Sequence, residues 1–244
     1  MKARVLYIKE VDSTNNYLRH CTAEAGEMVV AWTDFQTAGR GCGTNTWESE
    51  AGKNLTFSML FCPEGVAARE QFILSMASAV ALKRVLDRYT AEICIKWPND
   101  IYWADRKICG TLIETTLSGK SVKTCIVGTG LNVNQQLFRS DAPNPVSLCQ
   151  ILGHETDREY LLSELVDETM LTLEDVYAGH YDDLRSEYRA ALYRKGEVHG
   201  YRLPDGSEAQ LMLMDVEDDG HLLLTQPDGT GEQRFGFKEI QFII

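Results

Sequence analysis

Apolar and polar positions in the first half of the chain alternate in short blocks that predict β-strands. Blocks of roughly four to eight residues, rich in apolar and β-branched side chains and bounded by polar or turn-forming ones, are typical of strands. Such blocks stand at Val5–Ile8, Met28–Trp32, Leu55–Phe61, Ile93–Trp97, Gly110–Thr116 and Val122–Val127. The segment from Gln36 to Trp47 is rich in glycine and threonine and is predicted to be a loop.

Longer segments show the spacing of helices. Ala67–Tyr89 is the longest of them, and its apolar residues lie on nearly all sides, which predicts an almost wholly buried helix. Asp157–Tyr177 and His180–Tyr193 predict two more helices. A short helix near the start of the chain can be capped by Asp12 or Ser13.

The pattern changes near the end of the chain. From Glu197 onward, short apolar blocks are separated by turn signals typical of hairpins. These signals are Asp205-Gly206, Asp218-Asp219-Gly220 and Asp228-Gly229. We therefore predict an α+β fold, with a first unit at residues 1–195, a boundary at Lys195-Gly196, and a small all-β unit at residues 196–244.

Charge limits the classes of partner. The chain has 24 Lys and Arg against 36 Asp and Glu, a net charge of −12, which argues against a nucleic-acid binder because such proteins neutralise phosphates. The imbalance is also local. The segment from Leu203 to Gln233 contains eight acidic residues and no Lys or Arg.

The seven cysteines are scattered, and none forms a Cys-x-x-Cys pair, which argues against a zinc knuckle or a dithiol redox site. The first residues lack the apolar core of a secretory leader, and no apolar stretch is long enough to span a bilayer. We therefore expect a cytoplasmic protein with reduced thiols, no membrane partner and no metal held by its side chains.

One basic residue stands inside an apolar block. In Ile95-Lys96-Trp97-Pro98, the alternation of a strand places Ile95 and Trp97 on one face and Lys96 on the other. A desolvated ammonium without a partner is costly, so Lys96 needs an anionic partner or access to water. Taken alone, the pattern fits a surface lysine that protects an edge strand as well as it fits a binding residue.

Three further segments combine glycine with basic or amide side chains. Gly39-Arg40-Gly41 lies in the predicted loop, where glycine lets backbone N–H groups approach an anion and arginine offers a planar donor fork. The others are Lys107-Ile108-Cys109-Gly110 and Gly128-Thr129-Gly130-Leu131-Asn132. Neither a Walker A motif nor a dinucleotide-binding fingerprint is present. Each segment alone also fits a solvated loop, a basic hairpin turn or a bulge.

Taken together and in order, these segments resemble the biotin protein ligases. The order is Ser13-Thr14-Asn15, Gly39-Arg40-Gly41, Lys96-Trp97-Pro98-Asn99-Asp100, Lys107 with Gly110, and Gly128-x-Gly130-x-Asn132. The similarity runs from about Val11 to Asn134, and Lys-Trp-Pro-Asn-Asp is among the most specific short motifs of that family. It implies a mixed sheet packed by helices, followed by a small SH3-like C-terminal domain. Because the chain begins directly at the catalytic domain, we expect the monofunctional class, without an N-terminal DNA-binding domain.

The resemblance implies an enzyme that activates biotin with ATP as biotinyl-5′-AMP, releasing pyrophosphate. It would then transfer biotin to a lysine of a biotin carboxyl carrier protein, and Mg²⁺ would accompany ATP. A homodimer is left open. The nearest alternative is a lipoate–protein ligase with the same adenylate chemistry, although Trp97-Pro98-Asn99-Asp100 favours biotin. A second alternative is a non-catalytic, biotin-binding regulatory module, against which the retention of Arg40, Lys96 and Lys107 argues.

The resemblance also implies roles for individual residues. Ser13, Thr14, Asn15 and Gln36 would meet the ureido ring of biotin, and Gly39, Arg40, Gly41 and Cys42 would form a loop over biotin and the adenylate. Lys96 would lie between the biotin carboxylate and the α-phosphate of ATP, with Asn99, Asp100 and Lys107 on the nucleotide side. Gly110 and Gly130 would make room for ligand, and Asn132 would close the nucleotide end. The implied catalytic residues are Lys96, Arg40, Asp100 and Lys107, and Asp100 would orient the acceptor amine. Cys42 has no charge-based role, because further arginines that many family members carry in this loop are absent here.

Overall fold

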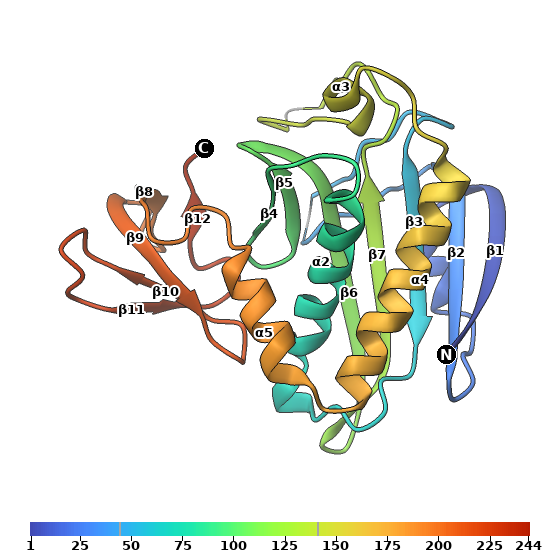
Figure 1. Ribbon diagram of the computed structural model, residues 1–244, viewed down its shortest axis with the longest axis horizontal. Coiled ribbons are helices and arrows are strands. Elements are labelled where there is room, and N and C mark those ends of the chain that lie inside the picture. The colour runs from blue at the N-terminus through green and yellow to red at the C-terminus, as the bar shows by residue number, and fades with distance from the viewer. Residues whose placement is uncertain (44, 141) are drawn as a thin grey trace.

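In the computed structural model, which describes residues 1–43, 45–140 and 142–244, the chain forms a large mixed sheet covered by helices and a small second sheet (Figure 1). Thr44, in the predicted loop, lies outside the described residues. The large sheet has seven strands in the order β1-β2-β3-β7-β6-β5-β4. They are β1 (Lys2–Val11), β2 (Glu27–Gln36), β3 (Leu55–Phe61), β4 (Ile93–Lys96), β5 (Asp100–Trp103), β6 (Arg106–Ser118) and β7 (Ser121–Leu131). Only β1 and β2 are parallel, so the sheet is mixed, as predicted.

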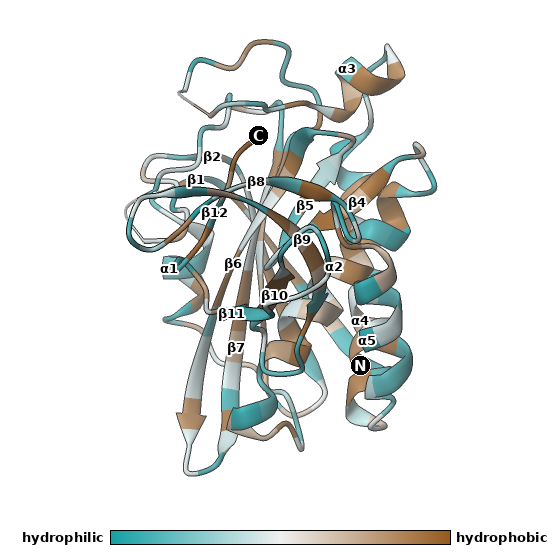
Figure 2. Ribbon diagram, turned by 90° about the vertical axis from the view of Figure 1, so that its left-hand side faces the viewer, coloured by the Kyte–Doolittle hydropathy of each residue, from teal (hydrophilic) through white to brown (hydrophobic). Residues whose placement is uncertain are grey.

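Helices cover both faces of this sheet. One face carries α2 (Phe72–Leu86), α4 (Arg158–Tyr177) and α5 (Tyr181–Ala190), while the short α1 (Thr14–Leu18) lies on the other (Figures 1 and 2). The α2 helix is buried on nearly all sides because it lies between the sheet and its two neighbouring helices, which confirms the predicted burial. The short α3 (Leu148–Leu152) was not predicted.

The predicted length of the central helix is wrong. A separate 3₁₀ turn, η1 (Ala68–Glu70), precedes α2, because the backbone N–H of Ala68 bonds to Lys120 and ties this turn to the β6–β7 hairpin. The longest helix is therefore α4. In addition, β1 and β2 extend beyond their apolar blocks, because β1 is an edge strand whose polar residues still pair with β2.

The last part of the chain forms the predicted small all-β unit. Its five strands, in the order β11-β10-β9-β8-β12, are β8 (Val198–Arg202), β9 (Glu208–Val216), β10 (Leu222–Thr225), β11 (Gln233–Phe235) and β12 (Gln241–Phe242). All pairings are antiparallel. The predicted turns are confirmed, with Gly206, Gly220 and Gly229 all at positive φ. The predicted boundary falls between α5 and β8.

The small sheet packs against the β4 end of the large one. The segment that leads from α5 to the small sheet pairs with β4: the backbone N–H of Ile95 donates to Ala191, and Tyr193 N–H donates back to Ile95. The indole N–H of Trp97 donates to the Gly220 carbonyl of the small unit, at 2.9 Å. The turn after β4 is thus bonded directly to the small unit.

Candidate functional site

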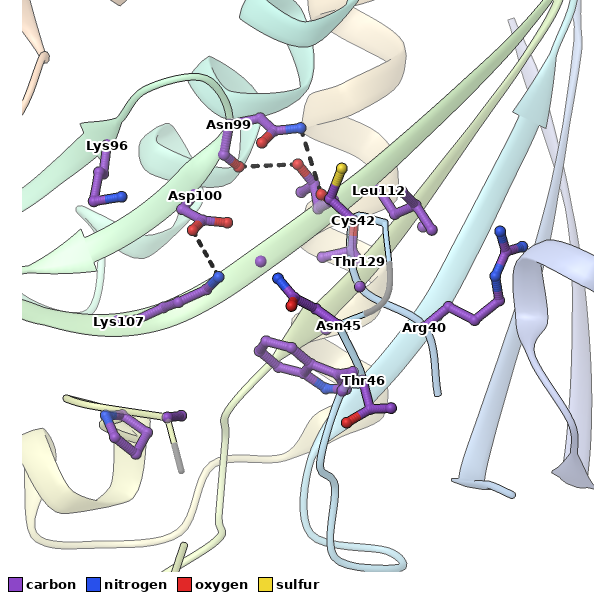
Figure 3. A pocket seen from close by; sticks show the side chains of 18 of the residues that line it. Arg40, Cys42, Asn45, Thr46, Lys96, Asn99, Asp100, Lys107, Leu112 and Thr129 are labelled. Atoms are coloured by element: carbon purple, nitrogen blue, oxygen red, sulfur yellow. Dashed lines mark hydrogen bonds and ion pairs between the residues drawn. The ribbon is translucent and has the colours of Figure 1, made fainter. Parts of the chain in front are cut away.

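A cavity of about 1020 Å³ lies over the end of the large sheet that faces the small one. Its walls come from the α1 N-terminus, the loop after β2, the β4–β5 turn, strands β6 and β7, and the C-terminal tail (Figure 3). The predicted site residues that line it are Ser13, Thr14, Asn15, Gln36, Arg40, Gly41, Cys42, Lys96, Asn99, Asp100, Lys107, Gly110, Gly130 and Asn132. Thus segments far apart in the sequence converge on one cavity.

Gly39 is the predicted site residue that does not line the cavity. Its carbonyl accepts the N–H of Trp47 at 3.0 Å, and a Cβ at this position would meet the Trp47 carbonyl at 2.5 Å. The absence of a side chain at Gly39 therefore lets the two ends of the loop come together. Its neighbours Arg40 and Gly41 line the cavity instead.

One end of the cavity holds a buried chain of hydrogen bonds. Gln36 Oε1 accepts from the backbone N–H and the hydroxyl of Thr14, at 2.8 and 3.1 Å. The Thr14 hydroxyl lies 2.6 Å from that of Ser58, which donates to Asn15 Oδ1, also at 2.6 Å. This fixed row of hydroxyl and amide groups suits a compact polar head group in an otherwise apolar wall.

The Asn15 side chain packs directly against the backbone of β7, where a glycine leaves space for it. It lies against Gly128, whose strand neighbours in register are Ser58 and Leu112. The Asn15 amide donates to the Leu112 carbonyl at 3.3 Å and to Glu114 at 3.0 Å. Because Gly128 has no side chain, the Asn15 amide can approach the strands closely enough to bond to Ser58 on one side and to Leu112 on the other.

The Arg40 guanidinium is held at the rim. It donates to Asn16 at 3.1 Å and to Glu114 at 3.3 Å, and it points away from the other labelled side chains in Figure 3. Glu114 also pairs with Arg19. The charge of Arg40 is therefore partly neutralised in this structure by its ion pair with Glu114.

Trp47 fills the floor of the cavity. Gly110 and Gly130 are direct partners across β6 and β7, and a Cβ on them would meet the indole at 3.1 and 2.2 Å respectively. The space that these glycines leave thus holds an indole, with the Lys107 ammonium 5.9 Å from the ring centroid. The Trp47 N–H is buried without a hydrogen-bond partner among the described residues.

Lys96 is the most unusual group in the cavity. Its ammonium lies over the rings of Tyr102 and Phe242, and it pairs with no carboxylate in the described part of the chain. Burial lowers the pKa of Lys96, and the nearby charge of Asp100 partly opposes that effect. A buried ammonium of this kind can receive an anionic ligand, so the binding role of Lys96 stays a prediction that this geometry allows.

The β4–β5 turn and β6 present the remaining polar groups. Lys107 donates to Asp100 at 2.6 Å, as the dashed line in Figure 3 shows. The Asn99 amide donates to the Thr111 carbonyl at 3.4 Å, and the Thr111 hydroxyl donates back to Asn99 at 2.9 Å. Asn132 donates to Val146, while its carbonyl oxygen is buried without a partner in the described residues.

Several cavity residues were missed by sequence reasoning. Gly128 stood in a motif that was singled out, and Trp47 closed the predicted loop, so both left a signal. Ser58 does not line the cavity but bonds to Thr14 and Asn15, which do, and it left a signal as a polar residue inside a fully buried strand. Phe242 left none, because an aromatic residue near the end of a chain is usually a core residue.

The described residues offer one cluster able to hold a metal, formed by Glu217, Asp219 and His221 in the small unit. Arg234 forms ion pairs with both carboxylates, so their negative charge is already balanced by a side chain of the protein itself. Also within the described ranges, no helix combines the length and the apolar character needed to cross a membrane.

The fold brings a buried ammonium, unpaired within the described residues, and a polar cradle to one cavity. The model of the biotin/lipoate A/B protein ligase family matches residues 7–132, about half of the chain. The chain belongs to that family.

Relatives and solved structures agree with this assignment. The bifunctional ligase/repressor BirA of Salmonella typhimurium is 33% identical over 70% of this chain and 53% of its own length. The biotin–[acetyl-CoA-carboxylase] ligase of Paracoccus denitrificans is 29% identical over 91% of this chain and 94% of its own. A biotin protein ligase from Aquifex aeolicus, solved with biotin and ATP, superposes with a TM-score of 0.75 at 25% identity, covering 97% of both chains. The chain spans about half the length of the BirA proteins that it matches.

Proposed function

We propose that this protein is a biotin–protein ligase that activates biotin with ATP and transfers it to a lysine of a biotin carboxyl carrier domain. The observation that carries the proposal is the Lys96 ammonium, half-buried and without a carboxylate partner among the described residues, in a cavity whose far end is a fixed polar cradle. The reaction joins two anions, and the site offers an unneutralised cation where they would meet.

In the first step, an oxygen of the biotin carboxylate attacks the α-phosphorus of ATP. A mixed anhydride forms, biotinyl-5′-AMP, and the bond to pyrophosphate breaks. Negative charge develops on the phosphoryl oxygens, so a fixed cation aimed at them lowers the barrier. We assign this charge-stabilising role to Lys96. Arg40 lies at the rim, where it can approach the adenylate after it leaves Glu114.

The size of the cavity supports two substrates. Small-molecule pockets commonly have volumes of about 300–1000 Å³, so a cavity of about 1020 Å³ can hold biotin and ATP together. Ser13, Thr14 and Asn15 offer donors and acceptors for the ureido head. Asn99, Lys107 and Asn132 line the opposite part, which we assign to the nucleotide.

Mg²⁺ would enter this site bound to the phosphates of ATP rather than to side chains of the protein. The Asp100 carboxylate at the proposed nucleotide side is paired with Lys107, so the chain provides no free cluster of carboxylates there within the described residues. Mg²⁺ is commonly bound through substrate phosphates and keeps several waters. When bound, it would neutralise charge on the phosphates, and this chain's residues would orient the nucleotide around it.

In the second step, the ε-amine of an acceptor lysine attacks the carbonyl carbon of biotinyl-5′-AMP. An amide bond forms, AMP leaves, and the amine loses a proton. Asp100 is the proposed orienting group, because its carboxylate lies beside the ammonium that faces the reacting anions. A homodimer, a cytoplasmic location and the absence of a nucleic-acid partner stay predictions.

Pyrophosphate exchange into ATP tests the proposal. We expect exchange that depends on biotin, with lipoate as the competing acid, followed by a biotin mass increment on a purified carrier domain. Exchange with lipoate alone would favour a lipoate ligase. Exchange with neither acid would overturn the adenylation proposal and leave the non-catalytic module.

The buried hydroxyl of Ser58 gives a prediction for the cradle. Replacing Ser58 by Ala is expected to weaken biotin binding about tenfold, because Asn15 Oδ1 and the Thr14 hydroxyl lose a shared partner. Titration calorimetry measures this. The matched control is Ser78→Ala, since Ser78 is also buried but donates to Leu74 within α2. Equal biotin affinities of the two variants would contradict the assignment of the cradle.

A further inference from the structure

The Lys96 ammonium is held by aromatic rings from both structural units. Its Nζ atom lies 5.5 Å from the ring centroid of Tyr102, in β5, and 4.6 Å from that of Phe242, in β12. Both distances are within the range in which the negative face of a ring attracts a cation. The shorter contact comes from the small C-terminal sheet.

The Phe242 ring is itself fixed. Phe242 pairs with Tyr201 of β8, and their ring centroids lie 5.0 Å apart. A contact at 6.5 Å joins Phe242 to Tyr193, which lies 5.3 Å from Tyr102. The backbone N–H of Ile243 then bonds to Gly200, which anchors the strand just beyond the ring. An aromatic row therefore runs from β5 to β12, alongside Lys96.

A lysine in this place needs such support. Its side chain has four rotatable bonds, and no carboxylate in the described residues fixes its end. Burial disfavours its charged form, whereas a ring face favours it without neutralising it. An aromatic contact thus holds the cation and leaves its charge available to an anion, which a salt bridge would not do.

We propose that Phe242 is a positioning residue for Lys96, through which the small C-terminal sheet takes part in the chemistry of the cavity. This inference rests on the proposed adenylation function for its effect on rate. The contact itself stands on the geometry alone.

Three variants test it: Phe242→Leu, Phe242→Tyr and Phe235→Leu. Phe242→Leu keeps apolar volume and removes the ring, while Phe242→Tyr keeps the ring. Phe235→Leu is the matched control, because Phe235 is a similarly buried ring in the same small sheet that does not line the cavity. We expect biotin-dependent pyrophosphate exchange to fall about five- to tenfold in kcat for Phe242→Leu, and to stay near the wild-type rate in the other two.

A second readout needs no activity. In the free protein, with lysine labelled by carbon-13 at Cε, the titration midpoint of Lys96 is expected to be lower in Phe242→Leu than in wild type, because the ring favours the charged form. Phe235→Leu and Phe242→Tyr should leave it in place. The other groups that face Lys96, namely Tyr102, Asp100, Lys107 and Arg194, are the same in all variants.

The outcomes separate the two proposals. A wild-type protein without exchange overturns the proposed function, while the titration still decides whether Phe242 holds Lys96. Equal titration midpoints in wild type and Phe242→Leu overturn the positioning role. Equal exchange rates for Phe242→Leu and Phe235→Leu, in a protein that is active, overturn it as well.

Discussion

Replacing Lys96 by Met is expected to lower the rate of biotin-dependent pyrophosphate exchange by about 100- to 1000-fold, the scale for removing one preorganised group that stabilises transition-state charge. Methionine matches the apolar stem of lysine without the terminal ammonium, so the change removes little besides the charge. The loss is expected mainly in kcat, because the charge that Lys96 meets grows during the reaction. An unchanged exchange rate would refute the assignment of Lys96.

The same substitution is expected to make the folded protein more stable. The Lys96 ammonium is removed from water without a carboxylate partner in the described residues, so its loss relieves a desolvation cost of about 1 kcal/mol or more. The control is Lys83→Met, since Lys83 pairs with Asp87 at 2.7 Å on the surface of α2. That variant should change the free energy of unfolding by less than about 0.5 kcal/mol in the opposite direction.

The stability gain at Lys96 has a defined pH dependence. Burial lowers the pKa of Lys96 below its ordinary value of 10.5, so in that interval the unfolded chain binds more protons than the folded one. The wild type therefore becomes more stable as the pH rises through the lowered pKa towards the ordinary value. The advantage of Lys96→Met, measured by urea unfolding, should be largest near neutral pH and shrink above it. A constant advantage up to pH 10.5 would contradict this account.

Replacing Gly128 by Ala is expected to weaken biotin binding by about 100-fold, equivalent to about 2.7 kcal/mol, and to lower the free energy of unfolding by about 1–3 kcal/mol. The new Cβ would lie 2.1 Å from Asn15 Oδ1 and 2.8 Å from Asn15 Cγ. Asn15 cannot simply move, because its amide is bonded to Ser58, Leu112 and Glu114. The cradle at the end of the cavity must therefore be displaced.

The matched control for this prediction is Gly200→Ala. Gly200 also lies in a strand, and a Cβ there would meet its nearest atoms, in Gln210 and Ile243, at 3.4 Å, which is ordinary contact. Calorimetry with biotin and unfolding in urea compare the two variants. If Gly128→Ala binds biotin as tightly as Gly200→Ala does, the cradle is not the binding site for biotin.

Local patterns predicted most of the elements, because each depends on neighbouring residues, but they missed the short α3 and β5. Leu55–Phe61 is β3 with the predicted bounds, since a strand buried on both faces reads as one apolar block. The hairpins of the small sheet followed from their Asp-Gly turns. The edge strand β1 was predicted too short, because its exposed residues form backbone pairs with β2 that apolar patterning does not reveal.

The sequence by itself determined most of the element types, and the order along the chain of the segments predicted to carry the chemistry, because those depend on local spacing and residue type. It could not determine the side-chain partners. Arg40 meets Glu114 across 74 residues, and Phe242 reaches Lys96 only because the small sheet packs beside β4. Strand order and register decide which distant side chains meet. For that reason only the tertiary structure distinguished Lys96, which has no ion pair among the described residues, from the paired charges of Arg40 and Lys107.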